Sequence, residues 1–389
     1  MPPPTSAHTL PRRLQRLDDD GHLLRGIGPL LRVSPGAPSS ARDSIRAAWR
    51  HGHLLRLTRG YYLDLRSWNE MAPWDRHTVA AAAYSHSHPG VVFTGATAAH
   101  LHGLPLTSIP GELRLRASAR GHRGRRPMAS APFSETVLGS PEPLPPRPPQ
   151  VRWQWNGVQA PAVQKPRDVR RRRRLTGDGW KARPVSAMSP VTIEARLKDG
   201  TPLGPVTVDP LPTVQLLLGS TLPFREAVVA LDGLHRMLPG PSETWAEKHA
   251  ERLETSAART RFETAWEFSD ARSESAGESL ARALIHELGF AAPELQRKIF
   301  SRDGREVARV DFWWEQVRVA GEFDGIGKYD VELHTSTRER RRSINREKSR
   351  DVELQRVCRH VTHWTWADLK DPARLEAELL RVGVPRRRR

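Results

Sequence analysis

The last third of the chain has the most regular pattern of hydrophobic and polar positions. Leucines recur at every fourth position from 280 to 288, which places them on one face of a helix. Ser275, followed three residues later by Glu278, resembles a capping box, and Gly289 is a helix-ending residue. The pattern predicts an amphipathic helix between these two signals.

Strand patterns follow this helix. Residues 295–300 alternate, Asp303-Gly304 is a strong hairpin turn signal, and residues 307–314 form the predicted return strand. The remaining predicted elements are a strand at 317–324, a helix at about 340–357, a strand at 361–366 and a helix from Asp371-Pro372 to Gly383. The order α-β-β-β-α-β-α predicts a mixed sheet with helices on its faces.

A second regular stretch spans residues 39–65. One apolar face predicts a helix over residues 41–51, and two short strands, 54–57 and 61–63, flank the turn at Arg59-Gly60. A helix followed by a basic hairpin is the second half of a winged helix, with the hairpin as the wing. Arg56 and Arg59 on that wing are therefore candidate contacts to DNA phosphates.

The region between these stretches contains two segments of biased composition. Residues 139–149 hold six prolines, which is typical of a linker. The second segment, residues 165–174, ends in five consecutive arginines: Arg170, Arg171, Arg172, Arg173 and Arg174. Such a run is either a solvated loop or a nucleic-acid contact that releases counterions from phosphates, and the sequence leaves both interpretations open.

Pattern and composition together predict an α/β (α+β) protein in five segments. They are a basic, Pro-rich N-terminal segment (1–37), a winged-helix-like module (38–70), a mixed α/β middle region (71–240), connecting helices (241–269) and a C-terminal mixed sheet flanked by helices (270–389).

Charge narrows the choice of partner. The 389 residues include 62 Lys and Arg against 44 Asp and Glu, a formal net charge of +18 at pH 7, which favours a polyanion such as nucleic acid. No apolar run approaches about 18 residues, the first residues lack a secretory signal, and the basic residues gather on no obvious amphipathic helix. We therefore expect a cytoplasmic protein without a membrane contact. Its single cysteine, Cys358, excludes an intramolecular disulfide and a multi-cysteine zinc site.

Three acids fall on the predicted C-terminal sheet. Asp311 lies in the middle of an apolar strand, on the face that it shares with Arg309 and Trp313, and Glu322 and Asp324 share a face at the end of the next strand. A buried carboxylate is costly unless it is paired, hydrogen-bonded or bound to a metal. Mg²⁺ typically takes one or two carboxylates together with waters and substrate phosphate, so a metal site is one interpretation. Structural acids and solvated strand ends are the others.

Lys328 follows Asp324 by four residues. In a metal site it can polarise the attacking water or stabilise negative charge that develops on a phosphate. A surface lysine after the turn 325–327 is the alternative interpretation.

The order of these elements and acids resembles the PD-(D/E)XK nuclease superfamily, and within it the very-short-patch-repair-like endonucleases. The resemblance covers about residues 270–370 and rests on Glu278, Gln296, Val310-Asp311-Phe312, Glu322-Phe323-Asp324-Gly325, Lys328-Tyr329, Glu347-Lys348, Arg350-Asp351 and residues 364–369. It implies a restriction-endonuclease-like sheet in which Asp311 and Glu322 bind the metal and Glu278 assists. The chain departs from the family pattern at Val310, where proline is usual, and at Asp324, where lysine is usual; Lys328 would then replace that lysine.

The N-terminal half resembles a second family, the AbiEi-type antitoxins of type IV toxin–antitoxin systems. Residues 52–62 resemble the wing of that family, and residues 98–104 and 208–232 resemble the region that follows it. The resemblance implies a DNA-binding module that often acts at its own promoter. It leaves any toxin partner unknown.

Two hypotheses about function follow from these patterns. The first is a DNA-binding endonuclease that depends on Mg²⁺ or Mn²⁺ and uses Asp311, Glu322, Asp324, Lys328 and Glu278. The second is a non-enzymatic DNA-binding regulator or antitoxin-like protein with an inactive nuclease fold. The sequence leaves open the target sequence, the choice of DNA or RNA, and the oligomeric state.

Overall fold

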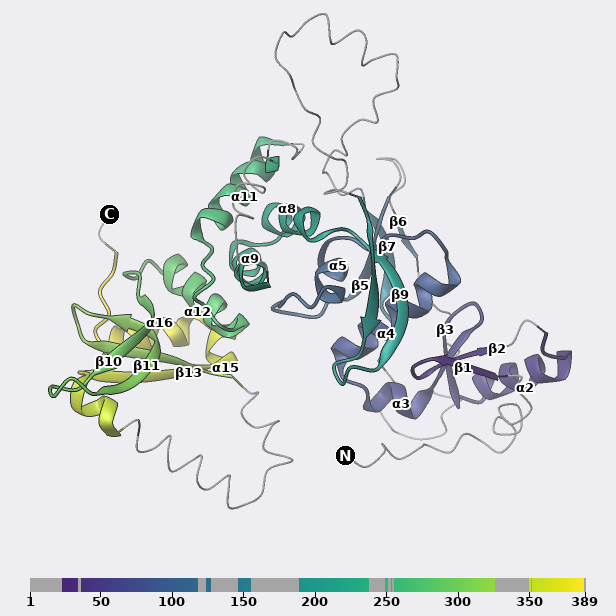
Figure 1. Cartoon of the computed structure of the whole chain (residues 1–389), viewed down its shortest axis with the longest axis horizontal. Helices are drawn as coiled ribbons and strands as arrows, with labels where there is room; N and C mark the ends of the chain where they lie inside the picture. The colour runs from purple at the N-terminus through teal and green to yellow at the C-terminus, as the bar shows by residue number, and fades with distance from the viewer. Residues whose placement is uncertain are drawn as a thin grey trace, which may run out of the picture. The chain divides into compact units, whose positions relative to one another are not determined.

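The computed structural model describes residues 23–33, 36–117, 124–126, 146–154, 189–237, 249–250, 253, 255–325, 350 and 352–387. Contacts divide the chain into two compact units: unit 1 comprises residues 1–104 and 108–214, and unit 2 comprises residues 105–107 and 215–389. Each unit combines helices with small sheets, so the chain belongs to the α+β class, as predicted (Figure 1). Among the helices of the described ranges, none combines the length and apolar character needed to cross a membrane.

Unit 1 begins with a four-stranded antiparallel sheet and the helices beside it. Its elements are β1 (Leu23–Ile27), β2 (Leu30–Val33), α2 (Ser39–Arg50), β3 (Leu54–Thr58), β4 (Tyr61–Asp64) and α3 (Leu65–Glu70), and the strand order is β1-β2-β4-β3. Ile45 and Ala48 of α2 pack with Leu31 and Leu54, and Gly60 closes the β3–β4 turn at a φ of +83°. The predicted helix and hairpin are confirmed, whereas the β1–β2 hairpin lies in a segment to which the sequence pattern assigned no strand.

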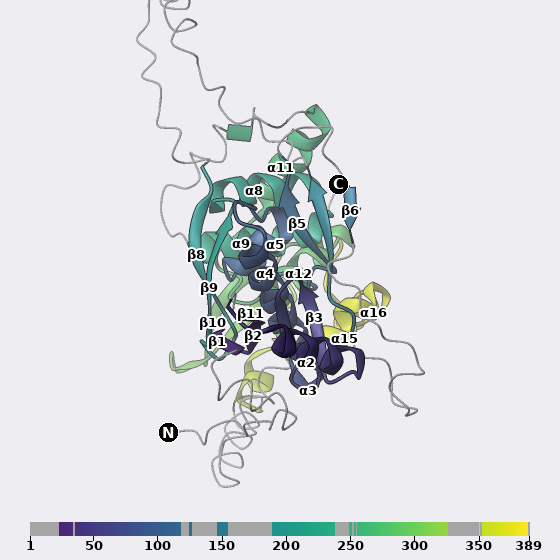
Figure 2. The same cartoon turned by 90° about the vertical axis from the view of Figure 1, so that its right-hand side faces the viewer.

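The rest of unit 1 is a mixed sheet with two helices. Its elements are α4 (Pro73–Ser87), α5 (Gly95–Leu101), β5 (Glu112–Arg116), β6 (Gly124–Arg126), β7 (Gln150–Gln154), β8 (Val191–Arg196) and β9 (Pro202–Val208). Strands pair in the order β5-β7-β6 and as β8-β9, and Phe93 bridges the two groups through Leu115 and Val208. Helix α4 packs against β9 (Figure 2).

Unit 2 contains the predicted C-terminal sheet. Its strands are β10 (Glu294–Phe300), β11 (Glu306–Trp314), β12 (Val319–Asp324) and β13 (His360–Thr365), in that order, with β12 and β13 parallel and the other pairs antiparallel. Its helices are most of α8 (Leu211–Thr221), α9 (Phe224–Met237), α11 (Ser256–Phe268), α12 (Ala276–Glu287), α15 (Trp366–Lys370) and α16 (Pro372–Arg381). Each observed strand begins and ends within two residues of its prediction, so the alternating pattern located the sheet.

Apolar side chains cover both faces of this sheet. On one face, Leu284 of α12 packs in a cluster with Phe312 and Trp364. On the other face, Val310 packs with Leu354 from the helical residues 352–357. The sheet is therefore enclosed between two layers, and polar side chains inside it need partners within the protein.

Gly321 of β12 lies where no side chain fits. A Cβ atom at this position would lie 2.3 Å from the Trp364 ring and 3.3 Å from the Trp314 ring. We expect Gly321→Ala to lower the free energy of unfolding of unit 2 by about 1–3 kcal/mol, because an added methyl group displaces packed side chains. Gly325→Ala is the control, since its Cβ would meet Phe323 at an ordinary 3.5 Å. Urea unfolding followed by tryptophan fluorescence measures both, and equal midpoints would contradict the close packing.

Candidate functional site

Asp311 lies where the alternation of side chains between the two faces of β11 is interrupted. Val310 belongs to the apolar cluster on one face and Phe312 to the cluster on the other, although strict alternation would keep them together. The prediction that Asp311 follows a regular alternation is therefore wrong at this point: Val310 and Trp313, three residues apart, share one cluster. The register of β10 and β11 places Gln296 opposite Asp311, and Gln296 has a φ of +53°, which is uncommon for a residue other than glycine. This local bend takes Asp311 out of the apolar alternation.

One amide side chain connects Asp311 to an acid on a helix. Gln296 Nε2 donates to Glu278 Oε2 at 2.9 Å and to Asp311 Oδ1 at 3.1 Å. The backbone N–H of Phe323 donates to Asp311 Oδ2 at 2.9 Å. Residues of β10, β11, β12 and α12 thus meet in one polar network, and both oxygens of Asp311 have a fixed donor.

Glu278 is buried in the first turn of α12. Ser275 caps the helix by accepting a hydrogen bond from the Glu278 N–H at 3.1 Å, which confirms half of the predicted capping box. The other half differs, because the Glu278 side chain accepts from the Glu274 N–H at 2.8 Å and not from the Ser275 N–H. Burial raises the pKa of Glu278, and the charge of Asp311 raises it further, against the opposing hydrogen bonds. Glu278 and Asp311 therefore repel each other as neighbouring acids, and Gln296 stabilises both.

Glu322 lies opposite Asp311 and is paired with an arginine. The register of β11 and β12, continued by one step, places Asp311 and Glu322 across from each other. The Glu322 side chain is buried, and Arg350 Nη2 donates both to Glu322 Oε1 and, at 2.9 Å, to the Arg309 carbonyl. Sequence analysis assigned Arg350 no site role, because no local pattern connects it to a strand 28 residues away.

The remaining predicted residues divide into two groups. Asp324 is half-exposed, and its Oδ2 lies 3.3 Å from Nδ1 of His363 on β13. Lys328 and the arginines at 170–174 lie outside the described residues. The structure joins Glu278 to Asp311 through Gln296, whereas Glu322 is placed opposite Asp311 by strand register and has its carboxylate on Arg350. We call these three acids with Gln296 the Asp311 cluster.

The donor atoms of the Asp311 cluster suit a hard divalent cation. Asp311 and Glu322 are carboxylates in facing positions, and Mg²⁺ needs one or two such ligands beside waters and substrate phosphate. Among the residues that the structure describes, no three acid, histidine or cysteine side chains are arranged to hold a metal ion. The residues fit an open site with two carboxylates, and they do not fit a closed structural site.

A basic surface covers α2 and the wing in unit 1. Arg42, Arg46 and Arg50 recur at every fourth position on the exposed side of α2. Arg42 and Arg46 line a hollow of about 280 Å³ together with Arg59 of the β3–β4 turn, and Arg56 lies on the adjoining β3. Arg56 and Arg59 were predicted from the wing pattern, whereas the arginines of α2 were not, although their spacing of four residues places them on one helical face.

Comparison with known proteins gives a limited result. No family model matches the chain. Two relatives from Mycobacterium tuberculosis, Uncharacterized protein MT2308 (strain CDC 1551 / Oshkosh) and Uncharacterized protein Rv2248 (strain ATCC 25618 / H37Rv), are each 36% identical to it over 115 residues. The match spans 29% of this chain and 39% of either relative. Neither name states an activity, so a functional conclusion has to come from the site itself.

Proposed function

We propose that this chain is a DNA-binding protein whose unit 2 hydrolyses phosphodiester bonds with Mg²⁺ or Mn²⁺. The observation that carries the proposal is the Asp311 cluster, in which Gln296 joins Asp311 to Glu278 and the register places Glu322 opposite Asp311. A buried acid with a shifted pKa, such as Glu278, is frequent at functional sites. The resemblance to PD-(D/E)XK nucleases supports the same residues.

The protein side chains have distinct tasks in this proposal. Asp311 and Glu322 hold the metal ion, which when bound lowers the pKa of a coordinated water and offsets charge on the phosphate. Gln296 and the Phe323 N–H each hold one oxygen of Asp311, so the carboxylate is oriented before the substrate binds. Glu278, with its raised pKa, holds a proton more readily near neutral pH than an ordinary glutamate and can exchange it in the reaction.

Arg350 sets a condition for metal binding. Its guanidinium donates a hydrogen bond to Glu322 Oε1, so this oxygen would hold a cation only after Arg350 moves away. A buried carboxylate without a counter-charge lowers the stability of the fold, and in the metal-free protein Arg350 provides that counter-charge for Glu322. Lys328 keeps its proposed task of stabilising charge on the phosphate, which rests on the sequence.

DNA affinity in this proposal comes from basic residues of unit 1. The arginines of α2 reach solvent together with Arg59, and each phosphate that such a side chain neutralises releases counterions. Arg56 and the run Arg170–Arg174 add charge of the same sign. A DNA partner implies a cytoplasmic location, and the antitoxin resemblance adds a toxin partner of unknown identity.

The experiment is cleavage of supercoiled plasmid by the full chain with Mg²⁺, with Mn²⁺ or with chelator. We expect nicked or linear product with either metal, and a loss of at least about 100-fold in rate, or about 2.7 kcal/mol, for Asp311→Asn. DNA affinity of this variant, measured by fluorescence anisotropy, should remain that of the unmodified protein. Asp303→Asn is the control, because it removes the same charge at the exposed turn between β10 and β11.

The outcomes separate the two functions. If Asp311→Asn cleaves as fast as the unmodified protein, the assignment of the Asp311 cluster is wrong. The Arg350–Glu322 pair favours the second candidate, a non-enzymatic DNA-binding regulator, because these charges neutralise each other without a metal ion. That candidate predicts salt-sensitive binding to a defined DNA site and no cleavage with either metal.

A further inference from the structure

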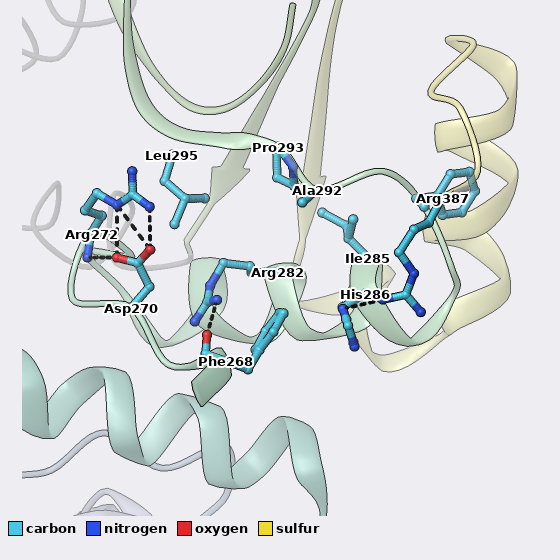
Figure 3. A pocket seen from close by; sticks show the side chains of 11 residues that line it. Phe268, Asp270, Arg272, Arg282, Ile285, His286, Ala292, Pro293, Leu295 and Arg387 are labelled. Carbon is cyan, nitrogen blue, oxygen red and sulfur yellow. Dashed lines mark hydrogen bonds and ion pairs between the residues drawn. The ribbon is translucent and has the colours of Figure 1, made fainter. Parts of the chain in front are cut away.

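A pocket in unit 2 lies beside the C-terminal end of α12. Figure 3 shows it bounded by Arg272 on one side and Arg387 on the other, with apolar side chains such as Leu295 and Ile285 between them. Its volume is about 230 Å³. Because typical sites for drug-sized ligands measure roughly 300–1,000 Å³, this pocket suits a smaller molecule, of the size of one planar ring with a substituent.

Two of the three arginines at this pocket are neutralised by carboxylates. Arg282 is buried, and its Nη2 lies 2.8 Å from Asp232 Oδ2 and 2.9 Å from Oδ1. Arg272 Nη2 lies 2.6 Å from Asp270 Oδ2, and Nε donates to both oxygens of the same carboxylate. Neither of these pairs leaves a net charge in the pocket.

Arg387 has a different partner. Its Nη1 donates to Nδ1 of His286 at 3.2 Å, which requires that nitrogen to act as an acceptor and the ring to be neutral. Burial lowers the pKa of His286, and the Arg387 charge lowers it further, in agreement with a neutral ring. Among the described residues, no carboxylate forms an ion pair with Arg387. The pocket therefore keeps one positive charge at its mouth.

The backbone fixes Arg387 in this position. The Arg387 N–H donates to the Gly289 carbonyl at 2.8 Å, and the Ala291 N–H donates to the Pro385 carbonyl at 2.8 Å. Arg386, the preceding residue, stacks its guanidinium 4.0 Å from the centre of the Phe290 ring. The positive charge at the mouth of the pocket thus lies on a segment that backbone hydrogen bonds hold in place. The N–H groups of the Arg387 guanidinium suit a carboxylate or phosphate oxygen.

We propose that this pocket binds a small aromatic acid, with the ring against Ile285, Leu295 and Phe290 and the oxyanion on Arg387. The apolar walls favour a flat hydrophobic body, and the one unneutralised guanidinium favours a single anionic group. A carboxylate and a phosphate ester share this chemistry. The proposal does not depend on whether unit 2 cleaves DNA.

The test measures binding to the full chain by titration calorimetry and thermal shift. The probes are benzoate and its neutral counterpart benzamide, and phenyl phosphate and its neutral counterpart phenol. We expect at least one anion to bind and to raise the melting temperature, and its neutral counterpart to bind at least about tenfold more weakly, or about 1.4 kcal/mol. Binding of benzoate alone identifies a carboxylate ligand, and binding of phenyl phosphate alone identifies a phosphate ester.

Two variants and one control locate the binding. Arg387→Gln should weaken binding of the anion at least about tenfold. Ala292→Trp, which places a large side chain in the mouth of the pocket from an exposed position, should abolish binding. Arg381→Gln is the matched control, since it removes one positive charge from α16 outside the pocket and should bind as the unmodified protein does. The proposal is overturned if neither anion binds, if the neutral counterparts bind equally well, or if Arg387→Gln binds with unchanged affinity.

Discussion

Replacing Asp232 by alanine is expected to lower the free energy of unfolding of unit 2 by about 3–5 kcal/mol, because it leaves a buried guanidinium without its counter-ion. Asp232 of α9 is fully buried, and Arg282 of α12 is nearly so. Burial raises the pKa of Asp232, while Arg282 and the Asp270 N–H, which donates to Oδ1 at 2.7 Å, lower it. The pair joins α9 to α12, and α12 carries Glu278 into the Asp311 cluster. Hydrogen exchange of buried amides in α9 and α12 measures the loss.

A double variant separates the loss of the pair from the loss of packing. Asp232→Leu with Arg282→Met replaces both charges by apolar side chains of comparable length, and such replacements are often neutral or stabilising. We expect the double variant to recover most of the stability that Asp232→Ala loses. If Asp232→Ala costs less than about 1 kcal/mol, or if the double variant is no more stable than the single one, the ion pair is not what holds α9 and α12 together.

The strands of unit 2 could be predicted because their information is local. Alternation located β10, β11, β12 and β13 to within two residues, and Asp303-Gly304 marked the turn of the first hairpin. The hairpin pairing of β10 with β11 was in the pattern, but the register of the strands and the position of β13 beside β12 were not. They depend on which strand lies beside which, and β13 joins β12 in parallel from more than 35 residues away.

The candidate site was only partly predictable, for the same reason. The acids at 311 and 322 indicated a site, and the family resemblance added Glu278; the structure joins Glu278 to Asp311 through Gln296 and places Glu322 opposite Asp311 by register. The bend at Asp311 escaped prediction, because nothing in the sequence marks Gln296 as a residue with positive φ. The role of Arg350 was not predicted either, because the mixture of acidic and basic residues around it is typical of a solvent-exposed helix. Both missed features involve contacts between distant segments.

Acid is expected to destabilise unit 1 through His77 of α4. This side chain is almost completely buried, and burial, followed by the charge of the nearby His100, lowers its pKa from 6.5 to about 3, while the Pro110 backbone opposes the shift. The unfolded chain therefore binds a proton below about pH 6.5 that the folded unit does not bind. Stability falls as the pH falls through this window, at a slope that approaches about 1.4 kcal/mol for each pH unit, which amounts to about 2.5 kcal/mol between pH 6 and pH 4.

His77→Phe tests this acid sensitivity with little change in shape. His77 meets the His100 ring edge to face at 5.1 Å, an arrangement that a phenyl ring can also adopt. Hydrogen exchange of buried α4 amides, corrected for the intrinsic exchange rate at each pH, should show a pH slope reduced by about one proton in this variant. His51→Phe, at an exposed position in the same unit, should keep the full slope. Parallel stability curves for His77→Phe and the unmodified protein would mean that the acid sensitivity of unit 1 arises elsewhere, with the partly buried His100 and His102, whose pKa values burial also lowers, as the next groups to replace.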